Sequence, residues 1–376
     1  MKLQRLAAVS RKEFLHILRD PLSLGLGIAI PMLLLFLFGY ALTLDVDRVP
    51  LTVWDRSATP ASREFISQFS GSRFFTLKQV ADSYRTIEQA IDTREVAIAL
   101  VIPADFARIQ AGRSATVQVL LDGSDATKAS LTSAYAETVA RTYNRDILLK
   151  ETRRSGMTPP APALDLRPRV WYNADLLSRN AIVPGLIAII MMVIAALLTS
   201  LTVAREWETG TMEQVIATPL TPAELVVGKL IPYFAIGMFD LALAVPAGRF
   251  VFAVPLRGSL LLLLGESVIF LIGALAFGMF LGIVTRSQLL ASQLALVGTV
   301  LPAFLLSGFI FPIDNMPAPI QVITHLITAR YFVEMLRGIY LKESGLAILA
   351  ASTILLLLYD VLVVTLSIRK FRKKIE

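Results

Sequence analysis

Six apolar runs of membrane-spanning length constrain the fold of this chain more than any other feature. They occupy residues 21–44, 178–204, 225–248, 259–284, 289–311 and 344–368. With 55% hydrophobic and 17% charged residues, a chain of 376 residues is too apolar for an ordinary soluble protein. We therefore predict an integral membrane α-helical protein with six transmembrane helices, an even number that returns both termini to the same side.

The Lys and Arg residues predict which side that is. They gather in residues 1–20, around the loop at 205–224 and in the basic tail 369–376, whereas the loop after the third span carries only Arg249 and Arg257. Short cytoplasmic segments are enriched in Lys and Arg, so we place the first group in the cytoplasm. Residues 1–20 also have the pattern of an amphipathic helix that suits an anionic inner leaflet. The net charge of +7 therefore indicates membrane orientation rather than nucleic-acid binding.

A polar insertion at residues 45–177, between the first two spans, has the composition of a soluble domain. Strand-like runs alternate with helical periodicity, which predicts an α/β domain. We expect strands at 50–55, 74–80, 95–102 and 116–121, and helices at 61–69, 83–92 and 126–152. A connector rich in Pro and basic residues follows at 153–169. The orientation of the spans places this domain outside the cytoplasm, as an inserted extracytoplasmic α/β domain between helices 1 and 2.

Residues 312–343 are too polar for a span, yet they are amphipathic. They carry Asp314, His325, Arg330, Glu334 and Arg337. We expect interfacial or re-entrant helices on the outer face, packed against protein or lining a watery vestibule. An ordinary outer loop is the alternative.

The loop at 205–224 carries two patterns that predict helix starts. Thr211 to Gln214 fits a capping box, which predicts a short helix that ends before Pro219. The sequence from Thr221 to Glu224 fits a second one, with Pro222 at the first helical position of the third span. In the short helix Met212, Val215 and Ile216 share one face. A well-capped surface loop would have the same pattern, so spacing alone leaves the role of this segment open.

Residues 206–229 resemble the signature of ABC transporter permeases of the type 2 exporter class, E-x-G-T-x-E-x-L-x-x-T-P-x-x-x-x-E-x-x-x-G-K. The matching residues are Glu208, Gly210, Thr211, Glu213, Thr218, Pro219, Glu224, Gly228 and Lys229, while Val215 replaces the usual Leu. Other stretches resemble the multidrug efflux subgroup with a large periplasmic domain: Lys12-Glu13, residues 18–21, Leu121-Asp122-Gly123, residues 306–312, Arg330-Tyr331-Phe332 and Arg337-Gly338.

This resemblance implies that the short helix is a coupling helix, which docks on a separate ATP-hydrolysing subunit. The residues expected at that contact are Glu206, Glu208, Gly210, Thr211, Met212, Glu213, Val215, Ile216 and Pro219. The resemblance also implies a second permease copy, identical or related, and a periplasmic adaptor (membrane fusion) protein. It places the chain among lipids of the bacterial inner membrane, where such permeases export drugs or other amphipathic compounds.

The sequence predicts no catalytic site of its own. Gly228-Lys229 lacks the upstream Gly and the following Ser or Thr of a phosphate-binding loop, so ATP and Mg would bind the partner ATPase. The chain has no cysteines, and His16 and His325 are predicted on opposite sides of the membrane. We therefore expect a non-catalytic subunit that binds no cofactor or metal.

Three acids fall inside the predicted spans, at Asp240, Glu266 and Asp360. Acids inside a membrane are costly and usually face a cavity or a partner. They could contact substrate or a cation along the transport pathway, or pair with Arg249 or Arg257. If Asp240 and Asp360 relay ions, the chain could instead be an ion-coupled secondary transporter. A non-transporting membrane anchor with a ligand-binding outer domain is a third possibility.

Overall fold

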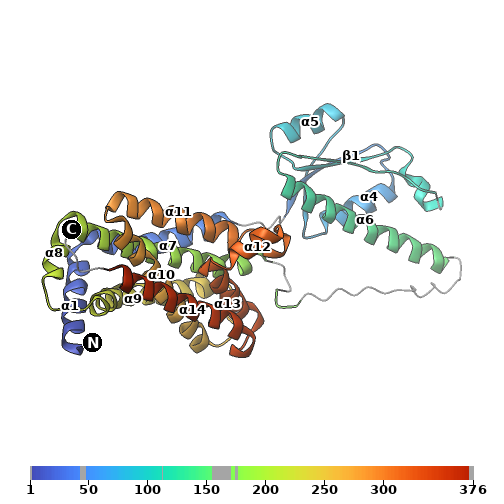
Figure 1. Ribbon diagram of the computed structural model, residues 1–376. Coiled ribbons are helices and arrows are strands. Elements are labelled where there is room, and N and C mark those ends of the chain that lie inside the picture. The colour runs from blue at the N-terminus through green and yellow to red at the C-terminus, as the bar shows by residue number, and fades with distance from the viewer. Residues whose placement is uncertain (1, 43–47, 112, 155–170, 174–176, 372–376) are drawn as a thin grey trace. The chain divides into compact units, whose positions relative to one another are not determined.

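The computed structural model describes residues 2–42, 48–111, 113–154, 171–173 and 177–371. The chain forms two compact units. Residues 1–44 and 169–376 make a helical unit, and residues 45–168 make an α/β unit. Figure 1 shows both units, and each is described by itself.

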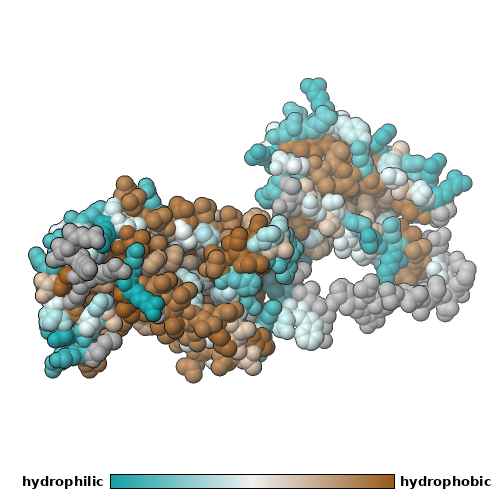
Figure 2. Space-filling model, in the orientation of Figure 1, coloured by the Kyte–Doolittle hydropathy of each residue, from teal (hydrophilic) through white to brown (hydrophobic). Residues whose placement is uncertain are grey.

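In the helical unit an amphipathic helix, α1, is followed by a long helical run in three parts and by the helices α7 to α14. Their bounds are α1 Leu3–Arg19, α2 Pro21–Leu24, a π-helical turn Gly25–Ala29, α3 Ile30–Ala41, α7 Ser178–Glu208, α8 Thr211–Ile216, α9 Pro222–Pro246 with a π-helical turn Ala247–Val251, α10 Leu260–Thr285, α11 Gln288–Leu306, α12 Ala318–Thr324, α13 Thr328–Lys342 and α14 Leu346–Lys370. Figure 2 shows apolar side chains over the middle of this unit and polar ones gathered near the end that carries α1.

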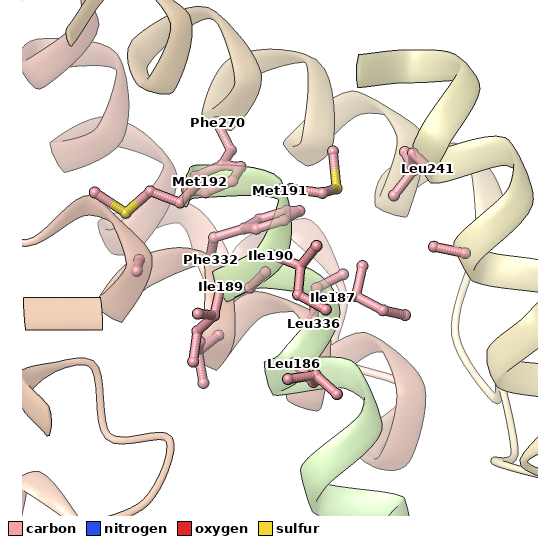
Figure 3. Packing of buried hydrophobic residues seen from close by; sticks show 14 of the residues in the cluster. Leu186, Ile187, Ile189, Ile190, Met191, Met192, Leu241, Phe270, Phe332 and Leu336 are labelled. Atoms are coloured by element: carbon pink, nitrogen blue, oxygen red, sulfur yellow. The ribbon is translucent and has the colours of Figure 1, made fainter. Parts of the chain in front are cut away.

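Helix α7 lies at the centre of the helical unit. It is apolar on all sides, so its stable position is surrounded by other helices, and it packs against α3, α9, α10, α11 and α13. Figure 3 shows Met191 and Met192 of α7 among Phe270 of α10 and Phe332 of α13. The two Phe rings stack with their centroids 4.0 Å apart.

Among the residues that the structure describes, five helices meet the length and hydropathy of a membrane span, namely α7, α9 with its π-helical turn, α10, α11 and α14. The sequence predicted six. The first predicted span is helical from Pro21 to Ala41, but the π-helical turn divides it, and the shorter apolar helix that remains is Gly27–Ala41. Pro31 has no amide to donate, and just before it the Ile30 amide bonds to the carbonyl of Gly25, five residues back.

The structure also corrects two local expectations. The first capping box does not form, because α8 begins immediately after a left-handed turn at Gly210 (φ 71°), and the Thr211 hydroxyl instead donates to the Glu206 carbonyl at 3.3 Å. The second box, at Thr221, forms as predicted. Helix α11 ends at Leu306, five residues before the predicted end at 311, where the chain turns through Gly308 (φ 80°).

Residues 312–343 are helical, as the sequence predicted. A short 3-10 turn, Ile313–Asn315, leads into α12 and α13. One face of α13 is fully buried through Phe332, Leu336 and Tyr340. The Arg337 guanidinium donates to the carbonyls of Ala181, Gly308 and Phe309 at 2.8–3.0 Å, which ties α13 to α7 and to the turn after α11.

The α/β unit has a four-stranded sheet in the order β2-β1-β3-β4. The strands are β1 Val49–Asp55, β2 Phe75–Val80, β3 Ile98–Ile102 and β4 Gln118–Leu121, of which only β4 is antiparallel to its neighbour. Alternate residues of β1 and β3 pack on opposite faces. One face is covered by α4 Pro60–Ser70 and α6 Ala126–Arg154, and the other by α5 Tyr84–Asp92. These elements match the predicted ones, except that the predicted connector at 153–169 lies almost entirely outside the described residues.

Candidate coupling surface and intramembrane acids

Helix α8 is anchored by its own apolar face. Met212 and Ile216 are buried in a cluster with Val9 of α1, Val203 of α7, Leu225 and Val226 of α9, Met279 and Ile283 of α10, and Phe371. Val215 is only partly buried and Glu213 is exposed. The helix therefore packs against four other helices and Phe371 at one end of the helical unit, and it presents Glu213 and part of Val215 outward.

A groove about 340 Å³ in volume runs between α1 and the segment that follows α8. We call it the α1–α8 groove. Its lining is mostly apolar, with charged side chains from α1, and consists of Arg5, Ala8, Val9, Lys12, Glu13, Val215, Thr218, Pro219, Leu220, Leu225 and Lys229. The sequence predicted Val215 and Pro219 in a contact surface, but it gave no indication that α1 forms the other wall.

Four charged side chains beside the groove form a network that we call the ion quartet, composed of Lys12, Glu13, Glu206 and Lys229. Lys229 Nζ lies 2.8 Å from Glu13 Oε1 and 2.6 Å from Glu206 Oε2. Lys12 Nζ lies 3.1 Å from Glu13 Oε1 and 2.8 Å from Glu206 Oε1. The side chains of Lys229 and Glu13 are 2% and 1% exposed. The quartet thus links α1 to both helices that flank α8.

The two α1 members of the quartet are held in their charged forms. Burial raises the pKa of Glu13, but the charges and hydrogen bonds of Lys229 and Lys12 outweigh it, so the net pKa lies below the usual value. Burial lowers the pKa of Lys12, but the hydrogen bonds and charges of Glu206 and Glu13 outweigh it and raise the net pKa. Both groups are therefore ionised at neutral pH, which keeps the buried charges balanced.

Helix α1 approaches α9 closely at Gly228. A Cβ atom there would lie 2.9 Å from the side chain of Val9, and the Ser10 hydroxyl donates to the Gly228 carbonyl at 2.9 Å. The amide of Lys2 donates to Glu224 Oε1 at 2.7 Å, while Glu224 Oε2 accepts the Thr221 amide at 3.0 Å. Each of the last three matched signature positions therefore has a structural task. Glu224 caps α9 and receives α1, Gly228 admits α1, and Lys229 joins the ion quartet.

The other predicted contact residues have different positions. Glu206 is nearly buried within the quartet, and Met212 and Ile216 point inward. Glu208 accepts the backbone and side-chain amides of Gln288, at the first residue of α11. Glu213 and Pro219 are exposed. Of these residues, only Val215 and Pro219 line the groove.

Sequence reasoning did not assign a role to Lys12, Glu13 or Lys229. A signal was available, because Lys229 interrupts an otherwise apolar run at the start of the third span. A lysine that is buried in such a run needs an acidic partner. Glu13, in the predicted amphipathic helix, and Glu206, at the end of the second span, were the candidates.

The three intramembrane acids are all buried. Neither Arg249 nor Arg257, both of which the structure describes, pairs with any of them. Glu266 of α10 accepts the Thr353 hydroxyl of α14 at 2.8 Å. Asp360 of α14 lies against Gly273 of α10, where an added Cβ would come within 2.1 Å of its carboxylate. These two acids therefore belong to the contact between α10 and α14.

Each of the three acids has one buried carboxylate oxygen without a hydrogen-bond partner among the described residues, namely Asp240 Oδ1, Glu266 Oε2 and Asp360 Oδ1. Asp240 is set apart by its position, because its side chain lines a cavity of about 20 Å³. A charged side chain near the centre of a membrane helix costs about 2.5–3.5 kcal/mol on insertion scales. Nothing in the described part of the fold offsets that cost for Asp240. Within the same described residues, no three His, Asp or Glu side chains gather into a group that could hold a metal ion.

Comparison with known proteins adds the evidence of relatives. A family model described as ABC-2 family transporter protein matches residues 22–369. A probable multidrug ABC transporter permease of Escherichia coli K12, YbhS, is 36% identical over 375 residues, which are 99% of this chain and 98% of YbhS. YbhR of the same organism, also a probable multidrug ABC transporter permease, is 30% identical over 99% of both chains. This chain therefore belongs to the ABC-2 family of transporter permeases.

Proposed function

We propose that this chain is the membrane subunit of an ATP-driven exporter, and that α8 is the coupling helix that receives the motion of a separate ATPase subunit. The observation that carries the proposal is the anchoring of α8. Its buried face, the Thr221 capping box and the ion quartet join it to α1, α7 and α9. A helix fixed in this way transmits a push at its surface to the helices it is joined to, whereas a loose loop would absorb it.

The partner would contact the outer side of α8 and the α1–α8 groove. Glu213, Val215 and Pro219 are among the exposed or half-buried residues of the α8 segment, and Arg5 and Lys12 add positive charge from α1. An apolar groove with a charged rim suits a protein partner, since the buried centre supplies affinity and the charges supply specificity. Glu206, Met212 and Ile216 support this surface from behind. Glu208 is exposed and holds the start of α11 through Gln288, while Gly210 and Thr211 shape the turn that precedes α8.

The geometry of the helical unit favours six membrane spans, namely the five long apolar helices and the divided first run. The run Pro21–Ala41 has 21 residues and would extend about 32 Å at 1.5 Å per residue, close to the thickness of a hydrocarbon core. It starts beside α1, which packs on the first turns of α9, and near its end Gly39 and Tyr40 meet Phe252, beyond the far end of α9. The run therefore traverses the unit, which supports cytoplasmic termini and an extracytoplasmic α/β unit in the bacterial inner membrane.

The assembly that we propose contains two permease copies, identical or related, two ATPase subunits that bind ATP and Mg, and a periplasmic adaptor protein. Helix α11 is suited to contact lipid or another protein subunit, because apolar side chains are exposed along it, namely Leu289, Leu294, Val297 and Leu301. The proposed cargo is a drug or another amphipathic compound, in keeping with the multidrug names of YbhS and YbhR. Among the intramembrane acids we assign the pathway role to Asp240.

The first test is purification of the complete transporter in mild detergent, with identification of the subunits that remain bound. We expect the wild-type chain to retain an ATPase subunit. Val215→Arg should abolish its retention because it places a charge in the α1–α8 groove. Arg11→Glu, which changes an exposed α1 residue outside the groove lining, is the matched control and should retain it. Equal retention of the ATPase by the Val215→Arg protein would refute the docking surface.

A second candidate function, ion-coupled secondary transport, is favoured by the buried carboxylates of Asp240 and Asp360, each of which has an oxygen without a hydrogen-bond partner among the described residues. It predicts that the purified chain alone moves substrate when an ion gradient is imposed. ATP-dependent transport that requires the ATPase subunit and is insensitive to the ion gradient would exclude it. Glu266 is hydrogen-bonded to Thr353, and Asp360 packs against Gly273. The three acids therefore do not form a continuous path along which ions could be relayed, as this alternative requires.

A further inference from the structure

The surroundings of Asp240 have the chemistry of a binding site. Asp240 is 5% exposed, and its carboxylate is enclosed by apolar and aromatic walls from four segments. The walls include Pro31 of α3, Met191 and Leu198 of α7, Tyr233 of α9 and Leu271 of α10. The cavity in this conformation, about 20 Å³, has room for one water molecule. The site is therefore closed here, with one unsatisfied carboxyl group in an otherwise apolar lining.

A ligand that matches this lining would carry a single positive charge on an otherwise apolar molecule. An anion would be repelled by the carboxylate, and a strongly polar neutral compound would find few partners in the described lining. The Tyr233 ring offers a π face and Met191 a polarizable sulfur, both of which favour a cation that carries apolar substituents. The Tyr233 hydroxyl donates to Thr202 at 2.8 Å, which fixes the ring at the wall of the cavity.

One wall of the cavity is built to move more easily than the others. The first helical run reaches the site at Pro31 and through Gly27, where an added Cβ would lie 3.3 Å from Ile236 and from Leu198. Gly27 belongs to the π-helical turn Gly25–Ala29. Such turns interrupt the regular hydrogen bonds of a helix and frequently occur at functional sites. Displacement of this run would open the cavity without unpacking α7 from α10.

We propose that Asp240 is the specificity residue of an occluded substrate site for lipophilic cations, which opens when the run Pro21–Ala41 moves away from α9. The inference rests on the proposed function as an exporter and adds to it the chemical class of the substrate. Its physical basis is a buried carboxylate that no described side chain satisfies, within apolar walls of which one is Pro31, on the helical run that contains the π-helical turn.

The test measures equilibrium binding of two probes of the same shape and opposite charge, tetraphenylphosphonium and tetraphenylborate, to the purified complete transporter. We expect the wild-type protein to bind tetraphenylphosphonium at least about tenfold more tightly than tetraphenylborate. Asp240→Asn should weaken tetraphenylphosphonium binding by about tenfold or more, and Asp240→Glu, which keeps the charge, should lose much less. Glu266→Gln and Asp360→Asn remove acids from the α10–α14 contact and should bind the cation within about twofold of wild type.

Three outcomes would overturn the proposal. They are equal wild-type affinity for both probes, undiminished cation binding by the Asp240→Asn protein, and an equal loss in either control variant. The wild-type comparison of the two probes needs no substitution, so it decides the proposal even where Asp240→Asn does not assemble. Binding is read without ATP. Loss of the ATPase subunit from the complex would refute the proposed function, whereas failure of charge selectivity in an intact complex would refute this inference alone.

Discussion

Lys229 shows how one nearly buried residue can support a surface through the charges that it holds in place. It lines the α1–α8 groove with a side chain that is only 2% exposed, and it pairs with Glu13 and Glu206 from two other helices. Its burial is tolerated because two carboxylates are within 2.8 Å. The same reasoning separates Glu206 from Glu213. Both are acids of the predicted contact segment, but Glu206 balances charge inside the protein while Glu213 is exposed.

We expect Lys229→Met to destabilise the permease by about 3–5 kcal/mol, because it leaves two buried carboxylates to share Lys12. Thermal unfolding of the purified protein in detergent measures this loss. The double variant Lys229→Met with Glu13→Gln should recover part of it, since the remaining Lys12–Glu206 pair is balanced. Arg141→Met removes an exposed ion pair with Glu137 and should cost no more than about 1 kcal/mol. Additive losses in the double variant would contradict the quartet.

The directions of Met212 and Ile216 could not be predicted from the sequence. Their spacing established that they share a face with Val215, but not whether that face meets a partner or the protein interior. The answer depends on α9 and on α1 and α10, which are distant in sequence, because all three helices pack against the buried face of α8 in the fold. In contrast, the capping box at Thr221 was predictable because all its hydrogen bonds lie within four residues.

At the scale of whole elements, hydropathy located the helices well and their ends less well. The second, fourth and sixth predicted spans correspond to α7, α10 and α14. The division of the first span and the early end of α11 depend on backbone geometry, at a π-helical turn and at a left-handed glycine, which an apolar run does not reveal. The small residues of α10 did carry usable information, because the G-x-x-x-G pattern at Gly278 and Gly282 marks the contact with α7.

This contact makes a second stability prediction. A Cβ atom at Gly278 would lie 2.2 Å from the Ala196 carbonyl oxygen and 2.3 Å from the Thr199 hydroxyl, so Gly278→Ala should push α10 from α7 and cost about 1–3 kcal/mol. Gly265 of the same helix has no atom within 4 Å of an added Cβ. Gly265→Ala should therefore be neutral or slightly stabilising. Thermal unfolding in detergent compares the two, and equal behaviour would exclude close α7–α10 packing.

At the scale of the whole molecule, the topology rests on whether the run Pro21–Ala41 crosses the membrane. In either case α7 separates the α/β unit from α8, provided α7 spans the bilayer. The position of the N-terminus is what changes. With six spans α1 lies on the same side as α8, as their shared cluster through Val9 and Met212 requires. With five, α1 would lie on the side of the α/β unit, and the ion quartet could not form across the bilayer.

The chain has no cysteines, so single cysteines can report each side without a background signal. Arg11 of α1, Gln214 of α8 and Glu88 of α5 are exposed positions suited to such substitutions. A membrane-impermeant maleimide applied to intact spheroplasts should label Glu88→Cys, and should label Arg11→Cys and Gln214→Cys only after the membrane is permeabilised. Labelling of Arg11→Cys together with Glu88→Cys in intact spheroplasts would mean that the first run does not cross. The quartet, the coupling surface and the moving wall at Asp240 would then all have to be rejected, because each needs α1 on the cytoplasmic side and the first run inside the bilayer.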